Sequence, residues 1–281
     1  MEKIQSAIAK ARAERDSQSS DRAISPPKGV GTAKAQATGA QGTSGIVAAW
    51  KALPSLNLDP SLMKRNRIVT LEAGSDAMGI DMMRTRALQQ MRDNNWRRLA
   101  ITSPTAGCGK STIAVNLALS LQRQPNLRIA LMEMDLRRPS LAKMVGVEHG
   151  ISFASVLEGS HPFEDNAVRY GSNLAISTIV KPMRDAAELL NGPSVPSALA
   201  DIEARYEPDM MLFDAPPMLV TDDMMAFARH VDCVLLVAGA ETTTIKEVDL
   251  CERELATQTN VMGVVLNKCR YMGPEYGYGY Y

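Results

Sequence analysis

The chain has 281 residues, and its 31 acidic side chains equal its 31 Lys and Arg in number, which gives a formal net charge of zero. This balance excludes the broad basic surface that non-specific nucleic-acid binding requires, so nucleic acid is not an expected partner. Hydrophobic residues make up 45% of the chain, enough for one substantial domain, yet no run reaches the roughly 18 to 20 apolar residues that cross a bilayer.

The first 66 residues are predicted to precede the folded domain. Residues 1–16 place Ile4 and Ile8 at helical spacing among charged side chains, which predicts a short amphipathic helix, and they lack the apolar core of a signal peptide. Residues 17–45 are rich in Ser, Gly, Ala, Gln and Pro, so we expect a flexible linker. These features predict a cytoplasmic chain whose folded part begins at residue 67.

From residue 67 to residue 270, short apolar runs alternate with segments of helical periodicity. The runs expected to form strands are 99–103, 128–135, 174–180, 209–214, 233–239 and 261–267. Most are continuously apolar, as are strands of a parallel sheet that is buried on both faces. The alternation predicts an α/β fold with a doubly wound, mostly parallel sheet, in which ligands bind at the carboxyl ends of the strands.

The first of these strands is followed by a phosphate-binding loop of the Walker A type, with Pro104 in place of the first consensus glycine. Glycines let backbone N–H groups approach the phosphates, the lysine reaches the outer phosphates, and the serine hydroxyl can ligate Mg²⁺. The residues predicted to bind nucleotide are Thr105, Ala106, Gly107, Cys108, Gly109, Lys110, Ser111 and Thr112. The pattern predicts a P-loop NTPase fold.

Two further strands end in acidic residues. Glu133 and Asp135 close one of them, and Asp214 closes the other. Because carboxyl ends of parallel strands meet at one edge of a sheet, these acids should converge on the phosphate site, where they can hold Mg²⁺ and orient a nucleophile. We therefore predict a site for ATP and Mg²⁺, with Ser111, Asp135 and Asp214 at the metal.

The motifs SPTAGCGKST, LMEMDLRRP and LFDAPP, with a tyrosine-rich C-terminus, resemble the Walker A, Walker A′, Walker B and C-terminal signatures of the bacterial tyrosine kinases of polysaccharide synthesis. The resemblance covers roughly residues 76–281. It implies a protein-tyrosine autokinase that regulates exopolysaccharide chain synthesis and export. It also implies a membrane adaptor, expected here as a separate protein, that recruits the cytoplasmic chain to the inner face of the membrane.

The resemblance also assigns roles to residues. It implies that Lys110, Glu133, Asp135 and Asp214 are catalytic, that Arg137 lies close to the phosphates, and that Asn267 contacts the base. The implied phospho-acceptors are Tyr271, Tyr276, Tyr278, Tyr280 and Tyr281. Glycines interleave these tyrosines, so we expect residues 271–281 to form a flexible tail that can reach a neighbouring active site.

Three departures from the family pattern leave alternatives open. Glu133 stands where the family usually has Asp, Cys108 replaces a Glu, and the helix that forms rings in the family retains at most Arg84 of its Glu and two Arg, so homo-oligomer formation stays open. One alternative is a nucleotide-gated scaffold with weak or no kinase activity. Another is a partitioning or division-site ATPase, although such proteins carry a second lysine where this chain has Thr105.

Overall fold

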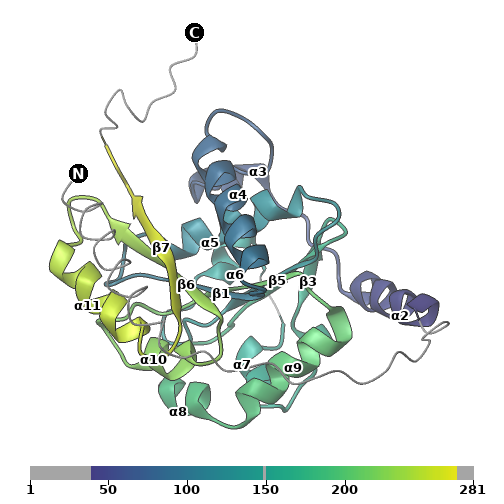
Figure 1. Cartoon of the computed structure of the whole chain (residues 1–281). Helices are drawn as coiled ribbons and strands as arrows, with labels where there is room; N and C mark the ends of the chain where they lie inside the picture. The colour runs from purple at the N-terminus through teal and green to yellow at the C-terminus, as the bar shows by residue number, and fades with distance from the viewer. Residues whose placement is uncertain (1–38, 148–149, 271–281) are drawn as a thin grey trace, which may run out of the picture. The chain divides into compact units, whose positions relative to one another are not determined.

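The structure is a computed structural model that describes residues 39–147 and 150–270. In this part of the chain, a seven-stranded sheet lies between two layers of helices (Figure 1). The strands are β1 (Arg98–Thr102), β2 (Ile129–Glu133), β3 (Val168–Tyr170), β4 (Leu174–Ser177), β5 (Met210–Asp214), β6 (Cys233–Gly239) and β7 (Asn260–Asn267). The helices are α2 (Gly39–Ala52), α3 (Pro60–Arg65), α4 (Met78–Asp93), α5 (Lys110–Gln122), α6 (Leu141–Val145), α7 (Phe153–Leu157), the 3₁₀ turn η1 (Phe163–Asp165), α8 (Ala186–Asn191), α9 (Ser194–Tyr206), α10 (Asp223–Ala228) and α11 (Ile245–Leu255).

The order of the strands brings the predicted motifs together. The sheet runs β3-β4-β2-β5-β1-β6-β7, and every neighbouring pair is parallel except β3 with β4. β5 lies between β1 and β2, and Asp214 at its end pairs in register with both Ile101 and Glu133. The chain reverses its winding direction here, which is where doubly wound sheets bind ligands.

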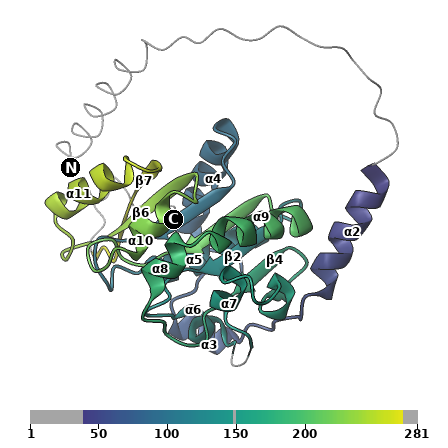
Figure 2. The ribbon, with the colours of Figure 1, turned by 90° about the horizontal axis from the view of Figure 1, so that it is seen from below.

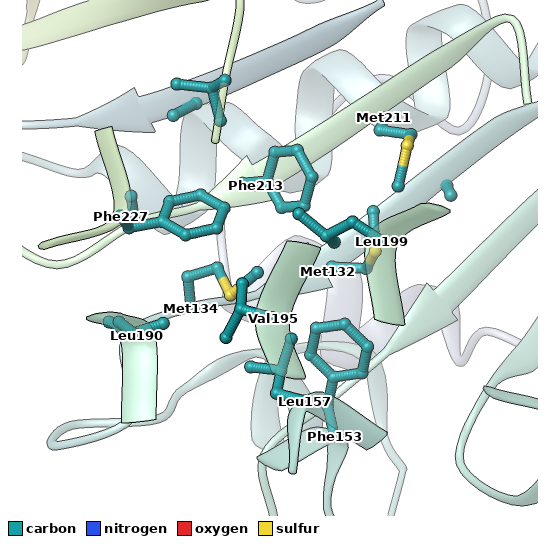
Figure 3. Close-up of a cluster of buried hydrophobic side chains, with 14 of the residues drawn as sticks. Met132, Met134, Phe153, Leu157, Leu190, Val195, Leu199, Met211, Phe213 and Phe227 are labelled. Atoms are coloured by element: carbon teal, nitrogen blue, oxygen red, sulfur yellow. The ribbon is translucent and has the colours of Figure 1, made fainter. Parts of the chain in front are cut away.

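Side chains alternate between two hydrophobic layers, one on each face of the sheet. In β2, Ala130 and Met132 face the layer of α7, α8, α9, α10 and α11, whereas Ile129 and Leu131 face the layer of α3, α4, α5 and α6. Figure 2 shows α8 and α9 in front of the sheet, and Figure 3 shows Phe153, Phe213 and Phe227 in the core beneath them. Burial on both faces explains why most strands read as continuous apolar runs.

Helix α2 begins inside the stretch predicted to be a flexible linker, and the domain boundary predicted at residue 67 lies too late. Ile46, Trp50 and Leu53 are buried in the core. The Trp50 indole Nε1 donates to the carbonyl oxygen of Tyr206 at 2.7 Å, and the two rings pack edge to face at 6.1 Å. Tertiary packing of this apolar end therefore stabilises a helix that its composition does not favour.

Strand β3 was not predicted either, because three partly buried residues give no readable pattern. A short bridge extends this edge, since the Leu56 backbone N–H donates to the carbonyl oxygen of Arg169 at 2.8 Å. None of the helices in residues 39–147 and 150–270 is both long and apolar enough to cross a bilayer. The expected N-terminal helix at residues 1–16 and the tail at residues 271–281 lie outside the described residues.

Candidate functional site

The Walker A loop, which connects β1 to α5, contains two glycines in the left-handed region. Gly107 has φ +84° and Gly109 has φ +94°, a region that side chains with a Cβ rarely adopt. A Cβ on Gly109 would also lie 2.3 Å from Nδ2 of Asn267. The backbone therefore favours glycine at both positions, and Ala106 and Gly107 are exposed at the tip of the loop.

The loop is bonded to the segment that follows β5. The Thr102 hydroxyl donates to the carbonyl oxygen of Pro216 at 2.5 Å. The Met218 backbone N–H donates to the carbonyl oxygen of Ser103 at 2.9 Å. On the other side, Nδ2 of Asn267 donates to the carbonyl oxygen of Cys108 at 2.9 Å. Asn267 therefore contacts the loop backbone, and its predicted contact with a base stays a prediction.

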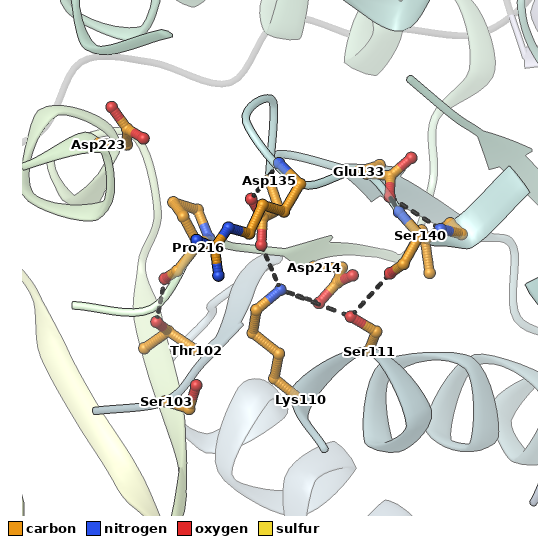
Figure 4. A network of polar contacts seen from close by, with 12 residues as sticks. Thr102, Ser103, Lys110, Ser111, Glu133, Asp135, Ser140, Asp214, Pro216 and Asp223 are labelled. Carbon is orange, nitrogen blue, oxygen red and sulfur yellow. Dashed lines mark hydrogen bonds and ion pairs between the residues drawn. The ribbon is translucent and has the colours of Figure 1, made fainter. Parts of the chain in front are cut away.

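Lys110 joins the two predicted acids at the strand ends (Figure 4). Its Nζ lies 2.9 Å from Oδ2 of Asp135 and 3.3 Å from Oδ1 of Asp214. Burial alone would lower the pKa of Lys110, but the charges of Asp214 and Asp135 outweigh burial and raise it, so the side chain stays an ammonium. The sequence thus correctly predicted that these three side chains come together, although they belong to three separate elements.

Asp214 is fully buried, and its second oxygen has no partner. Among the described residues, Oδ2 of Asp214 is the one buried side-chain oxygen without a hydrogen bond. Burial raises the pKa of Asp214, and the positive charge of Lys110 opposes that shift. An unpaired carboxylate oxygen beside Asp135 and the Ser111 hydroxyl is the oxygen-rich environment that Mg²⁺ prefers, so these three residues can hold it.

Glu133 bonds to backbone groups, and its predicted catalytic role stays a prediction. It is fully buried, and Oε1 accepts from the backbone N–H groups of Ser140 and, at 2.8 Å, Leu141, while Oε2 accepts from that of Ile179 at 2.8 Å. Burial raises the pKa of Glu133 to about 7, although the three N–H donors oppose that shift. Figure 4 shows the carboxylate beside Ser140, away from Lys110. Both oxygens therefore hold backbone segments in place.

Cys108 and Arg137 also have partners within the chain. The Cys108 thiol is buried against the carbonyl oxygen of Thr105 at 3.3 Å and the hydroxyl of Thr243 at 3.5 Å. Burial alone would raise its pKa, but hydrogen bonds with Thr243 and Thr105 lower it on balance.

Arg137 pairs with Asp223, a residue that the sequence did not single out. The five tyrosines predicted as acceptors lie outside the described residues.

A cavity of about 840 Å³ opens beside the loop, between α4, α5 and β7. Gly109, Thr112 and Asn267 line its end at the phosphate loop, and Ile80, Met83 and Met262 are among its apolar walls. Charged side chains such as Arg67 and Lys268 also line it, and its volume is in the range of small-ligand sites. One end of the cavity therefore adjoins the predicted phosphate site.

A family model described as ParA, NUBPL iron-transfer P-loop NTPase, matches residues 95–280. The chain belongs to this family of P-loop NTPases. The prediction of a doubly wound sheet with a P-loop NTPase fold is therefore confirmed, and with it a nucleotide-binding fold.

The predicted resemblance to bacterial tyrosine kinases is confirmed as well. The chain is 28% identical to the tyrosine-protein kinase YwqD of Bacillus subtilis, over 79% of this chain and 93% of that protein. The kinase domain of the Escherichia coli tyrosine kinase ETK superposes with a TM-score of 0.65 at 26% identity, over 74% of this chain and 82% of that one. AmsA of Erwinia amylovora is 28% identical over 79% of this chain, which spans only 31% of that protein.

Proposed function

We propose that this chain is an ATP-dependent protein-tyrosine autokinase. The observation that carries the proposal is the convergence of Lys110, Asp135 and Asp214 beside a P-loop, in a chain similar to proteins named tyrosine-protein kinases. The substrates would be ATP and the tyrosines of residues 271–281, namely Tyr271, Tyr276, Tyr278, Tyr280 and Tyr281.

The reaction is in-line transfer of the γ-phosphoryl group. A bond forms between the tyrosine oxygen and the γ-phosphorus, and the bond from that phosphorus to the oxygen bridging the β-phosphate breaks, which leaves ADP. The phenol proton passes to a carboxylate, for which we propose Oδ2 of Asp135, the oxygen that becomes free when Lys110 leaves it. Both oxygens of Glu133 accept backbone N–H bonds. Lys110 would leave its contacts with the two acids to stabilise charge on the transferring group.

Backbone groups would bind the phosphates before transfer. The loop from Thr105 to Gly109 ends at the first turn of α5, whose free N–H groups favour anions. Ser111, Asp135 and Asp214 would hold Mg²⁺, which neutralises negative charge on the phosphates when it is bound. The unpartnered Oδ2 of Asp214 supports this assignment.

In the cell, we propose that the kinase regulates exopolysaccharide chain synthesis and export from the cytoplasm. A membrane adaptor would recruit it to the inner face of the membrane. Homo-oligomer formation is part of the same proposal. In α4, the helix that would form the ring, Asp81 and Arg84 bond to side chains of their own chain. Arg84 donates to Asp81 at 3.3 Å and to the Ser120 hydroxyl at 3.1 Å, while Met78 is exposed.

Intact mass measurement and peptide mapping after incubation with ATP and Mg²⁺ test the proposal. We expect phosphate on tyrosines of residues 271–281 in the wild-type protein and none in Lys110→Ala. Lys143→Ala, which changes an exposed lysine of α6, is the matched control and should behave as wild type. Nucleotide binding without tyrosine modification, even with an adaptor segment added, would refute the kinase and favour the nucleotide-gated scaffold.

A further inference from the structure

Arg137, two residues after Asp135, is held by a buried carboxylate at the start of α10. Its Nε donates to Oδ2 of Asp223 at 2.7 Å and its Nη2 to Oδ1 at 3.0 Å. The Thr221 hydroxyl donates to the same carboxylate at 2.9 Å. The side chain of Asp223 is 1% exposed, so the carboxylate of this bidentate pair is shielded from water.

The surroundings of Arg137 favour this position over one at the phosphates. Two hydrogen bonds to Asp223 hold the guanidinium here, and the negative charges of Asp222 and Glu188 lie close to it. The acids therefore come from both α8 and α10, which pack against each other. Moving the guanidinium away would leave the Asp223 carboxylate buried without its cation, which is strongly unfavourable.

The pair joins the two loops that carry the acids of the site. On one side, the backbone N–H of Arg138 donates to Oδ1 of Asp135 at 3.1 Å, and the buried Leu136 accepts from the Met183 N–H at 2.8 Å. On the other side, Asp223 begins the helix that follows the segment after β5, which leads from Asp214. Figure 4 shows Asp223 well apart from Lys110, so it does not itself contact the reacting groups.

We propose that Asp223 is a positioning residue for the metal site, because its ion pair with Arg137 fixes the loop that carries Asp135 relative to Asp214. The inference rests on the Mg²⁺-nucleotide site of the proposed function but not on tyrosine as the acceptor. Removing a residue that hydrogen-bonds directly to a metal ligand changes metal affinity about 10- to 100-fold. Asp223 acts on the Asp135 loop through Arg137, so we expect an effect at the lower end of this range. A structural role alone would change stability without changing the response to Mg²⁺.

The test is the affinity of the full chain for a fluorescent ATP analogue, measured with and without Mg²⁺. In Asp223→Asn, we expect the gain in affinity that Mg²⁺ provides to fall about tenfold, while affinity without Mg²⁺ stays within about twofold of wild type. Arg137→Lys, which keeps the charge but loses the bidentate geometry, should give the same loss, and the double variant should be no worse than either. Asp249→Asn, at an exposed acid of α11, is the matched control and should resemble wild type.

Several results would overturn the inference. An unchanged Mg²⁺ response in Asp223→Asn, an equal loss of affinity with and without Mg²⁺, or no Mg²⁺ response in the wild-type chain would each do so. Tighter nucleotide binding in Asp223→Asn would mean that Asp223 keeps Arg137 from the phosphates. Thermal unfolding shows whether Asp223→Asn folds. If it does not, the Mg²⁺ response of Arg137→Lys decides whether the inference holds. If wild type binds Mg²⁺ and nucleotide but modifies no tyrosine, the proposed function fails while this inference stands.

Discussion

Replacing Glu133 tests whether this residue holds backbone segments or takes part in catalysis. Its carboxylate accepts three backbone N–H groups, from Ser140, Leu141 and Ile179, and it is fully buried. A buried donor left without a partner costs about 1–3 kcal/mol. In Glu133→Gln, the amide oxygen can keep two of the bonds, but the NH₂ group faces the third N–H, so we expect a loss of about 1–3 kcal/mol. Glu133→Ala removes both acceptor oxygens, leaves three N–H groups without a partner and should lose about 3–9 kcal/mol, a large part of a typical stability of about 5–15 kcal/mol.

The assay is urea unfolding of wild type and both variants at pH 8, above the raised pKa of about 7, where the carboxylate is ionised. Glu158→Gln is the control. It changes an exposed acid directly after α7 and should change stability little. If the free energy of unfolding of Glu133→Ala lies within about 1 kcal/mol of the wild-type value, the carboxylate does not hold these segments.

A second readout separates the two roles of Glu133. A general base contributes about 100- to 10,000-fold to a rate, so its loss in a folded protein is large. We expect Glu133→Gln to remain folded and to slow phosphoryl transfer less than about tenfold. A folded Glu133→Gln protein that binds nucleotide normally but transfers phosphate several hundredfold more slowly would refute the positioning role.

Three further predictions concern the loop, the core and pH. Gly109→Ala forces a Cβ into a left-handed position 2.3 Å from Nδ2 of Asn267, so nucleotide affinity measured by fluorescence titration should fall at least about tenfold, whereas Gly74→Ala, with open space around it, should not change it. Trp50→Ala removes a buried ring that packs on Tyr206 and should lower the free energy of unfolding by about 3–5 kcal/mol without changing nucleotide affinity; an unchanged stability would mean that α2 is not part of the domain. Burial lowers the pKa of His230 below its ordinary value of 6.5, so folding favours the neutral ring, and stability should fall as pH drops below 6.5; His230→Gln should show a smaller fall over the same range in urea titrations, and an equal fall would exclude His230 as the cause.

Much of the sheet could be predicted because its strands are buried on both faces. The run 233–239 matches β6 residue for residue, and the other five predicted strands lie within a few residues of their observed bounds. Strand β3 could not be predicted, since three residues on an edge need no apolar pattern. Helix α2 could not be predicted because Trp50 stabilises it through Tyr206, a contact between residues 156 positions apart.

The site divides in a similar way. The convergence of Lys110, Asp135 and Asp214 follows from strand order, since acids at the carboxyl ends of neighbouring parallel strands must meet. The partners of Glu133 and Arg137 depend instead on where distant loops pack, so spacing alone does not reveal them. The one sequence signal for Asp223 is weak, an acid that starts a helix soon after the Walker B segment.

The most direct test of the kinase proposal is the fate of the γ-phosphoryl group of ATP. ATP labelled at that position is incubated with the full chain and Mg²⁺, and the label is divided between tyrosine and inorganic phosphate over time. We expect label on tyrosines of residues 271–281 in wild type, and none on tyrosine in Lys110→Ala. Label that appears only as inorganic phosphate, with every tyrosine unmodified, would contradict the proposal and identify the chain as an ATPase.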